Sequence, residues 1–230
     1  MLLEVIVQSP ADAVEAARGG ADRLEVVRAI RQGGLTPPSS LVREIAAATT
    51  LPLRMMVRER DSYTLEPGDF AALRRAAEEF ALAGADGLVA GFAAGGRPDL
   101  DALRRVVGGV PVAVTFHRAF DVLEDPLRGI DAIGAVAGVD RILTSGGDGP
   151  AAGRAARLAQ YSARAADRLT VIAGGGVDRE ALALFARTGC VREVHVGRAA
   201  REGGDPEGPV SASLVRELRE VLDRRSDGGL

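Results

Sequence analysis

The strongest candidate for chemistry in this 230-residue chain is a cluster of ionisable groups that follows a short apolar run. His117, Arg118 and Asp121 belong to the segment 115–121, which follows the apolar run 111–114, and this run predicts a buried strand. Such groups are costly to bury at a strand end unless they are paired or used. A histidine can transfer protons near neutral pH. We therefore predict that His117 is a general acid or base and that Asp121 orients it.

Four further ionisable residues fall inside predicted strands or at their carboxyl ends: Glu4, Glu25, Arg58 and His195. Because side chains alternate between the two faces of a strand, these groups can share the inner face of a barrel. They would then converge with His117 on one pocket, where Glu4, Glu25 and His195 complete the predicted catalytic set. The alternative interpretation is a set of buried ion pairs that only fills the barrel.

Two glycine-rich loops after the sixth and seventh predicted strands indicate an anion site. Their candidate residues are Ser145, Gly146, Gly174, Gly175 and Gly176. Glycine lets backbone N–H groups approach an anion, and barrels often hold phosphate near the last two strands. Tight turns that need positive φ are the alternative explanation. Arg58 and Arg60 could clamp the same anion, or they could be solvated loop charges.

Metal binding is a separate hypothesis. The two carboxylates and two imidazoles of the predicted pocket could form a nitrogen and oxygen site for a divalent ion, although no HxH or HExxH spacing supports it. Copper(I) prefers thiolate and thioether ligands, for which the chain offers Met55, Met56 and Cys190 near its strands. Cys190 precedes the eighth predicted strand, at the opposite mouth, where an ordinary buried thiol is expected. The metal therefore stays unknown.

Apolar segments alternate with helical segments along the whole chain. Predicted strands cover residues 2–7, 23–27, 53–57, 86–89, 111–114, 140–143, 169–173 and 191–196. Their starts lie about 20 to 33 residues apart, as expected when a crossover helix follows each strand. The pattern predicts an α/β fold, a single (β/α)8 TIM barrel over residues 1–225, with a frayed tail at 226–230. An open doubly wound sheet is the alternative.

Some charged residues lie near the predicted strand starts, at the mouth where polar groups usually serve stability. They are Arg23, Arg141, Arg168 and Glu193. We leave these four out of the predicted site.

Composition restricts the classes of function. A net charge of −3 and a pI near 5.6 argue against nucleic-acid binding. All 29 basic residues are arginine, which excludes a Schiff-base lysine and a Walker A lysine. The sequence contains no apolar run of 18 residues and no cleavable leader, so we expect a cytoplasmic protein without a membrane span.

Five segments in order resemble the CutC copper-homeostasis family. They are ADRLE at 21–25, GGLTP at 33–37, TFHRAFD at 115–121, RILTSG at 141–146 and AGGGV at 173–177. The resemblance implies a cytoplasmic barrel that forms a homodimer or higher homo-oligomer and handles copper. It also implies a polar pocket at Glu4, Glu25, Arg58, His117, Arg118, Asp121, Ser145 and His195, in which we expect Arg118 to join the anion set.

The chain departs from the family pattern at several places, and two of these positions concern copper. Where the family commonly shows the cysteines that are candidates for copper(I), this sequence has Ile6 and Val27. Three hypotheses follow. The chain is a copper-homeostasis protein, or a barrel enzyme that uses His117 on a small phosphorylated or carboxylated metabolite, or a non-catalytic oligomeric scaffold. The expected partner is accordingly a small anionic ligand or copper, with neither nucleic acid nor membrane.

Overall fold

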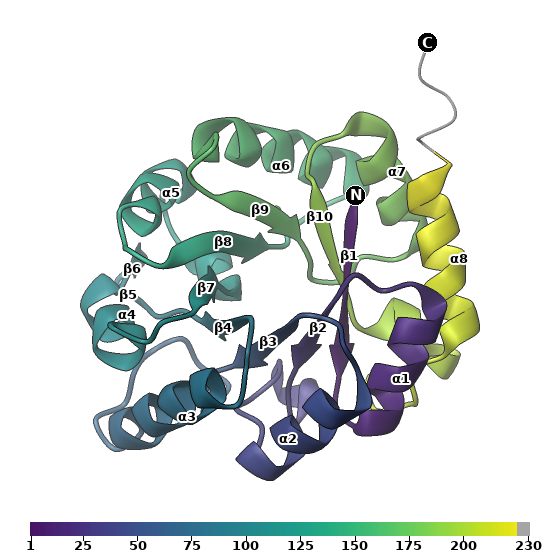
Figure 1. Ribbon diagram of the computed structural model, residues 1–230. Helices are drawn as coiled ribbons and strands as arrows, with labels where there is room; N and C mark the ends of the chain where they lie inside the picture. The colour runs from purple at the N-terminus through teal and green to yellow at the C-terminus, as the bar shows by residue number, and fades with distance from the viewer. Residues whose placement is uncertain (225–230) are drawn as a thin grey trace.

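The eight predicted strands form a closed, all-parallel barrel in the computed structural model, which describes residues 1–224 (Figure 1). Around the ring the strands are β1 (Leu2–Val7), β10 (Glu193–Val196), β9 (Thr170–Ala173), β8 (Val139–Thr144), β7 (Ala113–Phe116), β4 (Gly87–Ala90), β3 (Leu53–Met56) and β2 (Arg23–Val26). The predicted TIM barrel is confirmed. The tail predicted at 226–230 lies outside the described residues.

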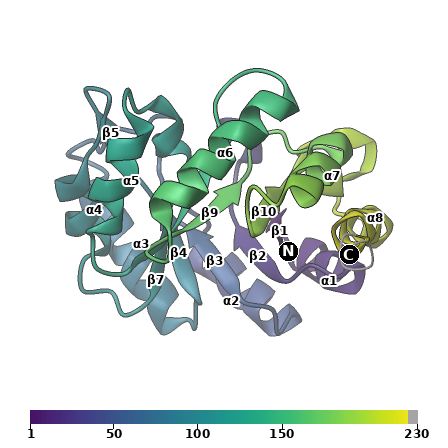
Figure 2. The same ribbon diagram turned by 90° about the horizontal axis from the view of Figure 1, so that it is seen from above.

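Helices cover the outside of the barrel. They are α1 (Pro10–Gly19), α2 (Ser39–Ala48), α3 (Phe70–Leu82), α4 (Leu100–Val107), α5 (Pro126–Gly134), α6 (Ala151–Ala165), α7 (Arg179–Thr188) and α8 (Ala212–Asp223). In a second view, β1 and β10 lie side by side with α1, α7 and α8 outside them (Figure 2). Within residues 1–224, no helix has both the length and the apolar character needed to cross a membrane.

Local sequence signals explain where several helices begin. Side chains that precede a helix accept a hydrogen bond from a backbone N–H in its first turn, which stabilises the helix start. These capping residues are Ser9 before α1, Asp99 before α4, Asp125 before α5 and Asp178 before α7. Pro10 and Pro126 occupy the first helical position, where the missing N–H costs nothing.

Short elements at the carboxyl ends of the strands complete the structure. They are the 3-10 helices η1 (Ile30–Gln32), η2 (Arg118–Val122), η3 (Arg198–Ala200) and η4 (Glu202–Gly204), and an antiparallel pair formed by β5 (Ala93–Ala94) and β6 (Arg97–Pro98). The sequence patterns did not predict the β5–β6 pair, because two-residue strands are too short to show a periodicity.

Ion pairs fill the amino-terminal half of the barrel interior. Arg23 donates to Glu4 from Nε and to Glu193 from Nη2, each at 2.5 Å. Arg141 also binds Glu193, with Nε 3.0 Å from Oε2. Arg23 therefore binds Glu4 directly from the amino-terminal side of the barrel, although we had left Arg23 out of the predicted site.

Arg54 continues the same interior layer on the other side of the barrel. Its guanidinium binds Asp140 at 2.9 Å and Asp86 at 3.1 Å. Gly87 makes room for it, because a Cβ at this position would lie 2.4 Å from Arg54 Nη1. The floor of the barrel is thus a charged layer, and any cavity must lie above it, at the carboxyl ends of the strands.

Candidate functional site

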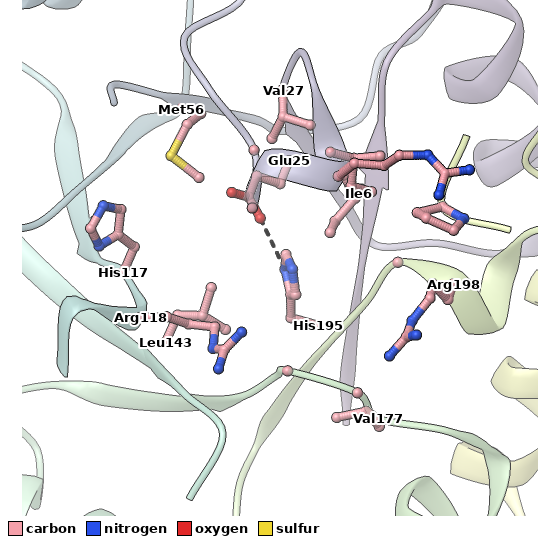
Figure 3. A pocket seen from close by; sticks show the side chains of 18 of the residues that line it. Ile6, Glu25, Val27, Met56, His117, Arg118, Leu143, Val177, His195 and Arg198 are labelled. Carbon is pink, nitrogen blue, oxygen red and sulfur yellow. Dashed lines mark ion pairs between the residues drawn. The ribbon is translucent and has the colours of Figure 1, made fainter. Parts of the chain in front are cut away.

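A cavity of about 840 Å³ opens at the carboxyl ends of the barrel strands (Figure 3). This size is ordinary for a small-molecule site. The predicted site residues that line it are Glu25, Arg58, His117, Arg118, Gly175, Gly176 and His195. Those that do not line it are Glu4, Arg60, Asp121, Ser145, Gly146 and Gly174. The barrel therefore brings the two histidines into one cavity, together with Glu25, one of the three predicted catalytic carboxylates.

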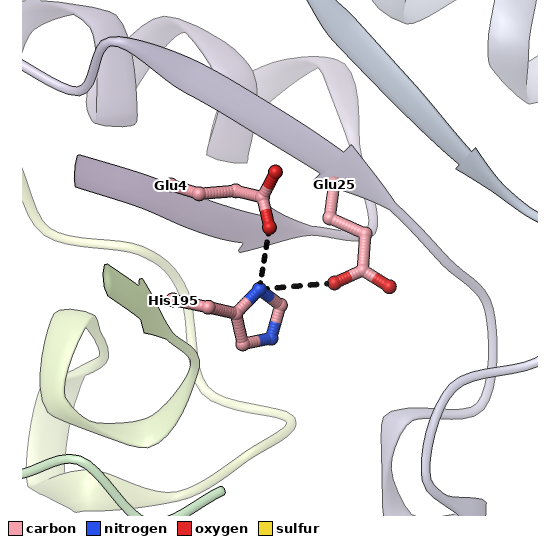
Figure 4. Close-up of side chains that lie close together, drawn as sticks. All are labelled: Glu4, Glu25 and His195. Carbon is pink, nitrogen blue, oxygen red and sulfur yellow. Dashed lines mark hydrogen bonds and ion pairs between the residues drawn. The ribbon is translucent and has the colours of Figure 1, made fainter. Parts of the chain in front are cut away.

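Glu4, Glu25 and His195 meet on neighbouring strands β1, β2 and β10 (Figure 4). Nδ1 of His195 lies 2.7 Å from Oε1 of Glu4 and 3.1 Å from Oε2 of Glu25. Glu4 lies one layer below the cavity, where its other oxygen accepts from Arg23. Within residues 1–224, the second oxygen of Glu25 has no hydrogen-bond partner.

The environment separates the pKa values of these two carboxyl groups. Burial alone raises the pKa of Glu4, but the hydrogen bond from His195 and the charge of Arg23 outweigh it and lower the pKa to about 2. Burial raises the pKa of Glu25 to about 7, since the opposing charge of His195 is not sufficient to offset it. Although burial opposes it, the charge of Glu25 and the bond to Glu4 raise the pKa of His195. Glu25 is therefore the carboxyl group that titrates near neutral pH.

His117 occupies the opposite wall of the cavity as a neutral ring. Burial, reinforced by the positive charge of Arg58, lowers its pKa to about 3. Nδ1 accepts the backbone N–H of Ala119 at 3.1 Å, so the neutral ring carries its proton on Nε2. Within residues 1–224, this buried Nε2 has no hydrogen-bond partner. The ring can donate one hydrogen bond to a ligand and has no free lone pair with which to accept a proton.

Asp121 does not orient His117, contrary to our prediction. Its carboxylate accepts from Arg118 Nε at 2.8 Å, from Thr144 Oγ1 at 2.6 Å and from the Ser145 N–H at 3.0 Å. The reason is local, because η2 places Asp121 three residues after Arg118 on the same turn. Asp121 is therefore a positioning residue for Arg118, and a backbone N–H takes its expected place on His117.

The predicted clamp of Arg58 and Arg60 does not form. Arg60 pairs with Asp69 at 2.5 Å outside the cavity. Arg58 lines the cavity, but it donates to Gly33 O, Ser62 O and Asp61 and so ties loops of the mouth together. The donors without a partner that could bind an anion therefore belong to other residues of the cavity.

The glycines of the predicted anion loops divide into two kinds. Gly175 and Gly176 face the cavity with φ near +70°. Gly174 instead provides space, since a Cβ there would lie 2.6 Å from Leu143 Cδ1 and 3.2 Å from His195 Cδ2. Gly146 packs against Leu158 away from the cavity, and Ser145 binds Asp121.

Sequence reasoning missed Arg198, which lines the cavity two residues after β10 ends. Within residues 1–224 its guanidinium has neither an ion pair nor a hydrogen bond. The rule that identified His117, a charged residue just after a strand, could also have identified Arg198. The glycine-rich character of the segment 197–209 obscured it.

Among the described residues, the cavity offers a single ligand of the kind that copper(I) prefers. Ile6 and Val27 pack with Met56 into a small apolar cluster on the cavity wall. Met56 supplies the one sulfur atom among the lining residues, and a single thioether is a poor copper(I) site. Met55 faces the outer core, and the buried Cys190 lies three residues before β10, at the other end of the barrel.

A harder divalent ion would have to use Glu4, Glu25 and His195, whose ligand atoms lie within 4.8 Å of one another. The three groups already bind each other, and Arg23 supplies a positive charge to Glu4. Carboxylate and imidazole groups suit ions such as zinc or manganese better than copper(I). We assign no metal to this trio.

Comparison with known proteins agrees with this architecture and identifies the family. The model of the CutC family matches residues 1–200. The chain belongs to the CutC family. A CutC family protein of Klebsiella pneumoniae is 39% identical over 199 residues, which cover 84% of this chain and 78% of the relative. A CutC family protein of Caulobacter vibrioides is 35% identical over 227 residues, covering 96% of this chain and 92% of the relative.

Solved structures support the same fold. The crystal structure of CutC from Streptococcus agalactiae has a TM-score of 0.77 at 21% identity, covering 85% of this chain and 97% of the other. The phosphoribosylanthranilate isomerase of Pyrococcus furiosus has a TM-score of 0.60 at 18% identity, covering 97% of this chain and 99% of the other. At these identities the likeness concerns the barrel and not its chemistry.

Proposed function

We propose that this CutC family member is an enzyme that binds a small phosphorylated or carboxylated metabolite in the barrel mouth and moves a proton on it. The observation that carries the proposal is the buried Nε2 of His117, which lacks a partner within residues 1–224. Leaving such a donor unsatisfied costs roughly 1–3 kcal/mol. A native protein tolerates that cost where a ligand completes the bond.

The proposed roles follow from the two walls of the cavity. The Nε2–H of His117 donates to the ligand oxygen on which negative charge develops, as a fixed donor does in an oxyanion site. Glu25, as the carboxylate, accepts a proton from the ligand through its unpartnered oxygen and later returns it. Its pKa of about 7 allows both protonation states at neutral pH. Arg118, held by Asp121, binds the anionic group.

A pair of substitutions at one position tests the proposal. In His117→Asn the side-chain oxygen can still accept the Ala119 N–H, but no donor reaches the position of Nε2. In His117→Gln the longer amide can place a donor there. A thermal-shift screen of phosphorylated and carboxylated metabolites should identify at least one compound that raises the Tm of the wild type. We expect His117→Asn to abolish this shift and His117→Gln to retain part of it. A shift that survives intact in His117→Asn, or the absence of any stabilising compound, would contradict the proposal.

Copper homeostasis is the second candidate function, and the family favours it. The name of the Streptococcus agalactiae relative assigns it to copper homeostasis. For this chain the candidate would depend on Met56, the one sulfur ligand of the cavity within the described residues. A copper(I) competition titration is the test. Tight binding that Met56→Leu abolishes would support this candidate, and the absence of tight binding would remove it.

The predicted cytoplasmic location and the predicted homodimer or higher homo-oligomer stay predictions.

A further inference from the structure

The loops that follow β9 and β10 present a group of backbone N–H donors at the cavity. They belong to Gly175, Gly176 and Val177 after β9, and to Gly197, Arg198 and Ala199 after β10. All six residues line the cavity, and none of their N–H groups donates a hydrogen bond to another residue of the described chain. Unpaired backbone donors from two adjacent strand ends therefore border the same space.

Arg154 on α6 fixes the direction of two of these donors. Its Nη2 donates to Gly174 O and to Gly175 O, each at 2.9 Å, and its Nε donates to Ser145 O at 2.7 Å. In a trans peptide the N–H points away from the C=O of the same unit. Binding both carbonyls on the helix side thus turns the N–H groups of Gly175 and Gly176 away from Arg154.

Two guanidinium groups flank the same glycine turn (Figure 3). A Cβ on Gly175 would lie 3.1 Å from Arg118 Cζ, and a Cβ on Gly176 would lie 4.0 Å from Arg198 Nη2. Arg118 shares its charge with Asp121, whereas Arg198 has no ion pair within residues 1–224. The nearby carboxylate of Asp178 is bound to the Ala181 N–H at 2.8 Å as the cap of α7. This bond leaves the charge of Asp178 in place, so the turn has three guanidinium groups, those of Arg118, Arg154 and Arg198, against the carboxylates of Asp121 and Asp178.

We propose that these two loops bind the phosphate group of a phosphate monoester, whose remaining part extends to His117. The inference rests on the proposed function and narrows its substrate class. A phosphate dianion presents three strong acceptor oxygens, enough to engage donors of both loops and both arginines at once, whereas a carboxylate has two. Loops after the last two strands are a frequent place for phosphate in barrels of this kind. The unpartnered Nε2 of His117 in the same cavity is the independent sign that a ligand belongs there.

Titration with inorganic phosphate tests the subsite directly, because this probe needs no knowledge of the natural ligand. In 1H–15N spectra we expect the amide signals of Gly175 and Gly176 to move downfield as phosphate is added. Arg198→Gln should weaken phosphate binding by about tenfold, since it removes a charged donor that no other contact holds.

Gly176 offers a matched pair of variants. Its φ of +70° favours glycine, and asparagine and aspartate are the side chains that best tolerate this region. Gly176→Asp should bind phosphate at least tenfold more weakly than Gly176→Asn, because the two side chains have the same shape and only aspartate adds a negative charge beside the anion. Gly84→Asp is the control for net charge. Gly84 also has a positive φ, has open space around it, and lies before β4 at the other end of the barrel.

The outcomes separate this inference from the function on which it rests. Phosphate binding that Gly176→Asp and Arg198→Gln leave unchanged, or shifts confined to other amides, would overturn the subsite. No phosphate binding at all would overturn it as well. If carboxylated compounds still stabilise the protein in a manner that depends on His117, the proposed function stands and only the phosphate subsite is wrong. If no anion of either class binds, both are wrong.

Discussion

Replacing Arg23 with leucine is expected to lower the free energy of unfolding by about 3–5 kcal/mol, the range found when one partner of a buried ion pair is removed. The Arg23 side chain is 3% exposed and lies between Glu4 and Glu193, each at 2.5 Å. Its loss removes the guanidinium that the buried carboxylates of Glu4 and Glu193 share, and leaves only His195 beside Glu4 and Arg141 beside Glu193. Equilibrium unfolding in urea at pH 7 measures the effect, because urea does not screen charges.

Arg168→Leu is the matched control for this substitution. Arg168 pairs with Asp131 on the surface, where its side chain is 48% exposed. Exposed pairs of this kind contribute less than about 1 kcal/mol. Equal losses in the two variants would show that the interior network does not hold the barrel together, and that Glu4 and Glu193 are solvated or protonated instead.

The second large effect is expected in the dependence of stability on pH. Folding lowers the pKa of His117 from 6.5 to about 3 because the ring is buried beside Arg58. The unfolded chain therefore binds this proton more tightly than the folded protein. The stability that the neutral ring contributes is fully present above pH 6.5 and is lost as the pH falls toward 3. Between pH 7 and pH 5 the loss from this one group is about 2 kcal/mol.

Comparison of the wild type with His117→Asn isolates that contribution. Asparagine stays neutral over the whole range and keeps an acceptor for the Ala119 N–H. Glu25 titrates in the same window with the opposite sign, since its folded-state pKa is raised to about 7, but it does so in both proteins. Urea unfolding at pH 7 and pH 5 should show a loss about 2 kcal/mol larger in the wild type. Parallel losses would show that His117 keeps its ordinary pKa in the folded protein.

The barrel was predictable because its determinants are local. Parallel strands covered on both sides form nearly continuous apolar runs, and each run in this chain is followed by a helical segment. The observed ends of some strands differ from the predicted ends by a few residues. The strand predicted at 111–114 lies at Ala113–Phe116, because Pro111 has no N–H to contribute to a strand ladder. This shift places His117 immediately after the strand end.

The partners of the site residues were not predictable, because they depend on which strands become neighbours. The sequence identified Glu4, Glu25 and His195 as charged groups within strands, and closure of the barrel brings them together. It could not indicate that Arg23 would reach Glu4 from the layer below. Nor could it show that a backbone N–H, rather than Asp121, would bind His117. Strand periodicity states which face a side chain occupies and not what it meets there.

The pairing of β1 with β10 has a consequence for how the protein is made. Glu4 meets His195 across 191 positions of the chain, so the ribosome has to release nearly all of this sequence before the two can touch. Until then β1 has an unpaired edge, and the carboxylate of Glu4 lacks its imidazole. Contacts this remote in sequence form slowly, and an open strand edge invites aggregation in the meantime. Closure of the barrel at β1 therefore has to wait for β10, the last strand of the chain.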